Sequence, residues 1–239
     1  MIENIDFRII YPFGSLVLLL LWLIIFKTRR DLRKLMLLFS IIFAFVGVLG
    51  EYFYFKDYWY PPAFIELNIL GIRILPDDIL FGFVSGGTLT FTYIFFFKYK
   101  IKVDYENFNK RVVSLLLYIA LGFALFAFII TKFNINSIFA TGIGCFLMSL
   151  IIITKRSDLA KHFIVSALVY GVIAFIFYFF FQLIVGSEYL YSVWLLDHSK
   201  FSFSLFGVAI PLTEVFFSAS VGSALTILSA YIFKYKFIK

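Results

Sequence analysis

Seven long apolar segments, separated by short polar linkers, make up most of this 239-residue chain. Each segment is long enough to cross about 30 Å of hydrocarbon at a rise of about 1.5 Å per helical residue. The pattern therefore predicts an all-α membrane fold with seven transmembrane helices, the first retained rather than cleaved as a signal peptide. The segments lie near residues 9–26, 35–55, 78–97, 112–131, 137–154, 163–185 and 211–233.

Composition agrees with a multi-pass protein of the cell membrane. The chain is 63% hydrophobic and 15% charged, which leaves too few polar side chains to cover a soluble fold of this size. Disorder, a nucleic-acid module and a secreted disulfide scaffold are thereby excluded, and Cys145 has no second cysteine to pair with. The lipid bilayer is the expected environment, and no nucleic-acid partner is expected.

The basic residues predict the orientation of the helices. Sixteen of the 21 Lys and Arg residues lie in the first, third and fifth linkers and the C-terminal tail, whereas five lie on the other side. Cytoplasmic loops are enriched in Lys and Arg, so the N-terminus is predicted outside and the C-terminus in the cytoplasm. Ten of the fourteen acids then belong to the outer half of the protein.

The chain contains an internal repeat, which decides its expected architecture. A segment around Trp59 recurs 135 residues later, and a cytoplasmic turn at Arg29 recurs as Arg156 at an offset of 127. The second copy therefore has eight extra residues near the outer end of its middle helix. The matched pairs are Trp59 and Trp194, Pro76 and Pro211, Phe81 and Phe216, Ser85 and Ser220, and Gly87 and Gly222.

Each repeat is expected to contain three helices, and an odd linker helix gives the two repeats the same orientation. The predicted plan is 3+1+3 parallel repeats: residues 1–100, a linker helix in 101–134, and residues 135–239.

A proline followed by acids opens the last helix of each repeat. The first copy reads Pro76-Asp77-Asp78-Ile79, and the second reads Pro211-Leu212-Thr213-Glu214. Proline and acids are also ordinary at helix N-termini. Two copies at an equal distance from a tryptophan, entering hydrocarbon where acids are costly, favour a functional site.

These features resemble the lycopene cyclase domain family, integral membrane carotenoid cyclases found as paired subunits or as fused tandem domains. The resemblance covers nearly the whole chain and implies the fused form. The family pattern has acids at the second and third positions after each proline. Here Asp78 fills the second position of the first copy, and Glu214 fills the third position of the second copy.

The resemblance implies a lycopene-type isoprenoid cyclase, an intramolecular lyase or isomerase in carotenoid biosynthesis that needs no redox cofactor. Its hydrophobic polyene substrate would be protonated at an alkene, closed through a carbocation and deprotonated. A carboxylic acid does this at neutral pH only if an apolar, water-poor site keeps it protonated. We therefore expect Asp78 and Glu214 to be the acid and base, with Asp77 as a second candidate.

Aromatic residues near these acids are candidates for substrate binding, because their faces could stabilise a carbocation. They are Trp59, Trp194, Phe81 and Phe216, and Glu51 is expected to face the same region, although its counterpart in the second copy is not acidic. Pro76 and Pro211 are expected to be structural. His162 and His198 are expected at the surface, and no metal or cofactor motif is present.

Two alternatives remain. Small sugar carriers share the 3+1+3 plan, but they resemble one another through a Pro-Gln pair in each repeat that this chain lacks. A catalytically inactive cyclase-like subunit would agree with the half-filled acid motifs.

Overall fold

The computed structural model describes residues 6–69, 71–103 and 105–239, except for the side chains of residues 198 and 199. His198 therefore lies outside the described side chains. The described part contains seven long apolar helices, whose bounds agree with the predicted segments to within four residues. They are α1 (Phe7–Thr28), α2 (Arg33–Asp57), α3 (Pro76–Phe96), α4 (Phe108–Phe133), α5 (Ser137–Lys155), α6 (Leu159–Val185) and α9 (Leu212–Ile232).

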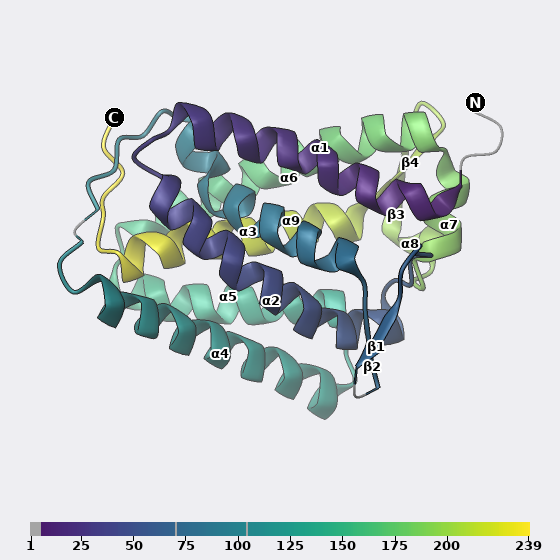
Figure 1. Ribbon diagram of the computed structural model, residues 1–239, viewed down its shortest axis with the longest axis horizontal. Coiled ribbons are helices and arrows are strands. Elements are labelled where there is room, and N and C mark those ends of the chain that lie inside the picture. Colours follow the sequence, from purple (N-terminus) through teal and green to yellow (C-terminus); the bar gives the residue numbers. More distant parts are fainter. Residues whose placement is uncertain (1–5, 70, 104) are drawn as a thin grey trace. The chain divides into compact units, whose positions relative to one another are not determined.

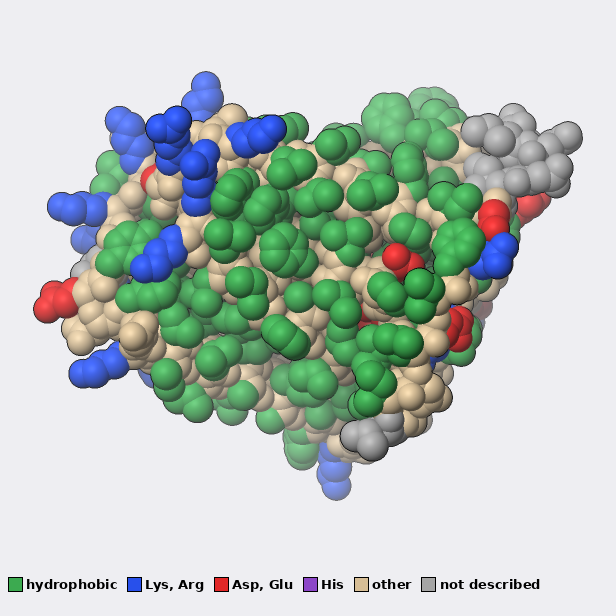
Figure 2. Space-filling view, in the orientation of Figure 1, with side chains coloured by type: hydrophobic (Ala, Val, Ile, Leu, Met, Phe, Trp, Pro, Cys, Tyr) green, Lys and Arg blue, Asp and Glu red, His purple; other side chains and the backbone are tan. Residues whose placement is uncertain are grey.

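The exposed faces of these helices are apolar, as a bilayer requires. Along α1 the exposed large side chains are Ile9, Phe13, Leu16, Leu20 and Ile24, spaced three or four residues apart on one helix face. Figure 2 shows hydrophobic side chains along the visible helices and Lys and Arg gathered where α1 meets α2. A helix face of this kind is stable against lipid rather than water, and the chain is a multi-pass membrane protein.

The connections following α2 and α6 contain short elements that the apolar pattern did not predict. Two antiparallel hairpins pair β1 with β2 and β3 with β4, so the prediction of an all-α fold is wrong in these loops. Three- and four-residue strands are too short to give a periodic signal, and pairing satisfies backbone groups that would otherwise be lost near hydrocarbon. The elements are β1 (Leu67–Ile69), β2 (Ile72–Ile74), α7 (Ser187–Val193), α8 (His198–Phe201), β3 (Ser202–Leu205) and β4 (Val208–Pro211).

Elements at matching positions of the two sequence copies correspond in type and length. Adding the offset of 127 to the bounds of α2, residues 33–57, gives residues 160–184. The observed helix in the second copy, α6, spans Leu159–Val185. Gly186 and α7 together supply the eight extra residues expected in the second copy. The hairpin turns contain Gly71 and Gly207, both with φ of +79°, a conformation that a side chain would strain.

The chain divides into two compact units. Unit 1 comprises Met1–Thr88 and Ile173–Val215, and unit 2 comprises Leu89–Val172 and Phe216–Lys239. Unit 1 includes α1, α2 and both hairpins, shown in Figure 1, together with the first turn of α9. These units are not the two sequence repeats. The repeat boundaries at residues 100 and 135 come from the sequence and stay a prediction.

Close helix packing in unit 1 depends on glycine. A Cβ atom at Gly82 would collide with the Phe43 carbonyl oxygen, and one at Gly86 would lie 2.6 Å from the Phe39 carbonyl oxygen. The Gly82–Gly86 step therefore lets α3 approach α2 closely.

In unit 2, α4 and α5 pack beside each other. His162, also in unit 2, is half-buried rather than at the surface. Its ring stacks on Phe237 with centroids 4.0 Å apart, and its Nδ1 atom lies 2.9 Å from the Tyr93 hydroxyl. The surface prediction for His162 is wrong because the C-terminal segment returns to pair with Lys100, whose amide donates to the Ile238 carbonyl at 2.7 Å.

Candidate acid cluster in unit 1

The two predicted tryptophans meet in a backbone bridge. Trp59 and Trp194 are antiparallel partners, flanked by hydrogen bonds from the Tyr60 amide to the Val193 carbonyl and from the Leu195 amide to the Tyr58 carbonyl, each 2.7 Å long. The two indole rings lie 6.2 Å apart. Equivalent residues of the two sequence copies therefore lie opposite each other, and each indole N–H is directed to a carboxylate.

Glu214, the third residue of α9, is 9% exposed and is held by three donors. Its Oε1 atom accepts from the Tyr58 hydroxyl and from Trp194 Nε1 at 2.9 Å, and its Oε2 atom accepts from the Tyr178 hydroxyl at 3.0 Å. Burial and the neighbouring Glu214 carboxylate raise the pKa of Tyr58 well above its usual value. Tyr58 therefore keeps its proton and remains a hydrogen-bond donor.

Glu51 occupies the corresponding place beside the other tryptophan. It is 5% exposed in the last third of α2, and its Oε2 atom accepts from Trp59 Nε1 at 2.8 Å. Glu51 interacts electrostatically with both Asp78 and Glu214. We call Glu51, Asp78 and Glu214 the acid cluster.

Asp78, the third residue of α3, is 1% exposed. Its Oδ2 atom accepts from the Leu75 amide at 3.0 Å, which caps the start of the helix. Its side chain also interacts with the buried Tyr11 hydroxyl, and neither its Oδ1 atom nor that hydroxyl forms a hydrogen bond with any other described atom. Asp78 thus combines a hydrogen bond from the backbone at its helix start with a contact to the Tyr11 hydroxyl.

One cation balances part of this negative charge. Arg73 of β2 interacts electrostatically with Glu51 and Asp78 and forms an ion pair with Glu66. Its guanidinium lies 4.1 Å from the Tyr60 ring centroid. The hydrogen bond from Arg73 holds the pKa of Glu66 below its usual value, so Glu66 is stabilised as a carboxylate by this ion pair.

The other predicted site residues differ in their surroundings. Asp77 is half-buried, and Phe81 contacts the Tyr11 ring at 5.7 Å. Phe216 is 40% exposed and packs on Phe139 of α5, both in unit 2. Pro76 is the first residue of α3, and Pro211 is the last residue of β4.

Three tyrosines around the acids were missed from the sequence. Tyr58 aligns with Val193 in the second copy, so the repeat gave no signal for it. Tyr178 aligns with Glu51 at the offset of 127, and that alignment could have identified it as a member of the site. Tyr11 precedes Pro12 in α1 and has no distinguishing pattern.

Among the described residues, no group of three His, Cys, Asp or Glu side chains is placed to hold a metal ion. Comparisons of the chain with protein-family models, curated proteins and solved structures found no match.

Proposed function

We propose that this chain is an integral membrane isoprenoid cyclase that closes the end group of a polyene by acid–base chemistry, without redox change or cofactor. The observation that supports this most strongly is the contrast within the acid cluster. Glu214 is held by three side-chain donors, whereas the buried Asp78 accepts one backbone hydrogen bond and otherwise interacts with the Tyr11 hydroxyl.

In this proposal Asp78 is the general acid. Its carboxyl proton is added to one carbon of the terminal alkene, whose electron pair forms the new C–H bond and leaves a tertiary carbocation. The next alkene attacks that carbocation and closes the ring, which moves the positive charge to a ring carbon. No atom other than the transferred proton enters the product.

Glu214 is the general base that completes the reaction. Its carboxylate removes a proton from the carbon beside the ring carbocation, and the C–H electron pair becomes the ring double bond. Glu214 releases this proton to solvent, and Asp78 takes a new proton from solvent before the next turnover. Substrate and product are therefore isomers.

Aromatic faces near the acids would stabilise the carbocation. The Tyr11 ring meets the Trp59 ring edge-on at 4.7 Å, and the Trp59 ring lies 6.2 Å from Trp194. The electron-rich faces of these rings would stabilise the positive charge while the ring closes.

We place the acid cluster toward the outer leaflet of the cell membrane. This follows from the proposed 3+1+3 parallel repeats with the N-terminus outside, which the sixteen-to-five distribution of basic residues favours.

The test is expression in a lycopene-accumulating bacterial host with pigment analysis. Wild-type protein should convert red lycopene to cyclised products. Asp78→Asn should abolish conversion while still accepting the Leu75 amide hydrogen bond, and Glu214→Gln should do the same. Glu188→Gln, at an exposed residue of α7, is the matched acid-to-amide control and should retain conversion. Unchanged lycopene with well-expressed wild-type protein would contradict the proposal for this substrate.

A further inference from the structure

Gln182 has a buried amide group that no part of the acid–base chemistry uses. It is 2% exposed, and neither Nε2 nor Oε1 has a hydrogen-bond partner among the described residues. It lies on the face of α6 opposite the exposed Phe180 and Leu183 side chains. Burying an amide without hydrogen bonds is costly within a membrane, and buried polar groups generally have a hydrogen-bond partner.

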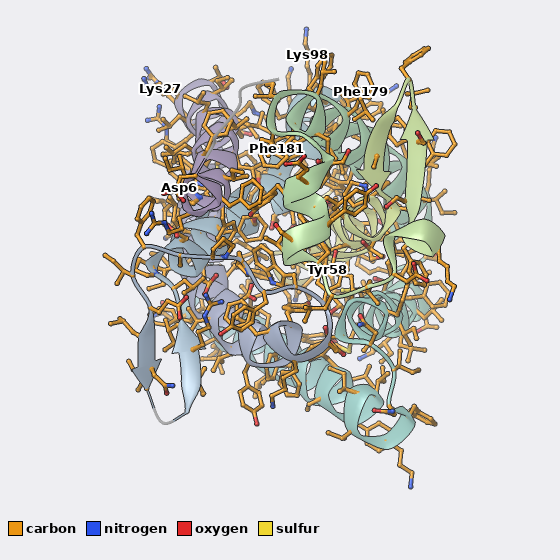
Figure 3. All side chains as sticks on the ribbon, turned by 90° about the vertical axis from the view of Figure 1, so that its right-hand side faces the viewer. Asp6, Lys27, Tyr58, Lys98, Phe179 and Phe181 are labelled. Carbon is orange, nitrogen blue, oxygen red and sulfur yellow. The ribbon has the colours of Figure 1, made fainter. Side chains whose placement is uncertain are left out.

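The neighbours of Gln182 belong to the surroundings of the acid cluster. Tyr178 lies one helical turn earlier on the same face of α6, and its hydroxyl donates to Glu214. The preceding residue, Phe181, packs against Gly14 of α1, and Tyr11 lies one turn before Gly14. Figure 3 shows Phe181 and Tyr58 near the middle of the view, whereas Asp6 and Lys27 lie toward its edge.

The Nε2 and Oε1 atoms of Gln182 determine which chemical group of a ligand could bind there. An amide needs an acceptor for its N–H groups and a donor for its oxygen, and a hydroxyl group provides both. A carboxylate or phosphate would be repelled by the acid cluster and would leave the amide oxygen unsatisfied. A purely hydrocarbon end group would leave both amide atoms unsatisfied.

We propose that Gln182 binds a neutral hydroxyl group of the isoprenoid ligand, so that unit 1 binds a hydroxylated isoprenoid more tightly than the matching pure hydrocarbon. This inference rests on the proposed function for the isoprenoid class alone. Gln182 is then a specificity-determining residue, because a site built to hydrogen-bond a hydroxyl disfavours the analogue that lacks it.

The test measures binding without turnover. Purified full-length protein in lipid nanodiscs is titrated with geranylgeraniol and, separately, with the matching C20 hydrocarbon that lacks the hydroxyl group, and tryptophan fluorescence gives the two dissociation constants. Wild-type protein should bind the alcohol about tenfold more tightly. Gln182→Leu should reduce that ratio about 3- to 10-fold by weakening alcohol binding alone, as expected for one or two hydrogen bonds.

Two control variants establish that the Gln182 amide itself causes the preference. Thr92→Val removes another buried hydroxyl without a described partner, in unit 2, and should leave the ratio unchanged. Gln182→Met repeats the test with an unbranched side chain if the leucine variant expresses poorly. Equal wild-type affinity for the two ligands, or equal weakening of both by Gln182→Leu, would overturn the inference and indicate that water or packing satisfies the amide.

The hydroxyl site and the cyclase activity are separable by experiment. Glu214→Gln should lose turnover and keep the preference for the alcohol. Absence of cyclisation together with a clear alcohol preference would refute the cyclase and retain the hydroxyl site, whereas cyclisation without any preference would do the reverse.

Discussion

Hydrogen-bond donors from distant parts of the sequence determine how Glu214 is held. Tyr58 follows α2, Tyr178 belongs to α6, and Trp194 follows α7. Each donor satisfies part of a buried carboxylate, and loss of one leaves that charge under-solvated. The position of Glu214 therefore depends on the bridge between Trp59 and Trp194 as much as on its own helix.

Replacement of Tyr58 by Phe tests that dependence. The variant should lower the free energy of unfolding by about 2 kcal/mol, because a hydrogen bond to a charged buried group is lost. Thermal or denaturant unfolding in detergent would measure the change. Tyr118→Phe removes a hydroxyl that bonds Tyr231 in unit 2 and should cost less, since that contact is only partly buried. Equal costs would contradict a special role for the Glu214 contact.

The ion pair of Glu66 and Arg73 gives a prediction for pH. The folded pKa of Glu66 is lowered by Arg73, so the pair stabilises the fold fully above pH 4.5, the usual value, and loses this contribution as pH falls through the lower folded value. Wild-type protein and Glu66→Gln should differ by less than about 1 kcal/mol near neutral pH, because Glu66 is half-exposed. The difference should vanish in acid, and a difference that grows in acid would be incompatible with this ion pair.

At the scale of elements, glycines determine how closely α2 and α3 approach. Gly86→Val should destabilise the protein by more than about 2 kcal/mol or prevent its accumulation, since the new side chain meets Phe39 and Phe43. Gly144→Ala in α5 is the matched control, because a Cβ atom there meets nothing within 4 Å. That variant should be neutral or stabilising by up to about 1 kcal/mol, measured by thermal unfolding. Good tolerance of Gly86→Val would show that the close approach is unimportant.

The elements also show what the sequence can and cannot predict. Runs of about twenty apolar residues specify the seven helices, because only a helix satisfies its backbone groups in lipid. The repeat predicted that Asp78 and Glu214 occupy equivalent helix starts and that eight residues are inserted before Trp194. The contacts of Tyr11 and Tyr58 could not be predicted, since they depend on side chains from separate helices meeting in three dimensions, whereas the alignment of Tyr178 with Glu51 could have identified Tyr178. The hairpins are too short for periodicity to reveal.

At the scale of the whole molecule, basic residues predict which side of the membrane each loop faces. A Cys145→Ala background removes the single native cysteine. Ser204→Cys in β3 and Lys161→Cys in α6 are then introduced separately, one on each predicted side of the membrane. A membrane-impermeant maleimide should label Ser204→Cys in intact cells and Lys161→Cys only after permeabilisation. The opposite pattern would invert the proposed orientation and place the acid cluster near the cytoplasmic leaflet.

In the proposed reaction Asp78 delivers a solvent-exchangeable proton to a polyene and Glu214 removes another. The most direct measurement is mass spectrometry of the product formed by purified protein from an acyclic polyene in D₂O. The product should have the composition of the substrate with one deuterium in place of one hydrogen for each ring closed, and Asp78→Asn and Glu214→Gln should form no product. Rings formed without deuterium, or formed equally well by both variants, would contradict it.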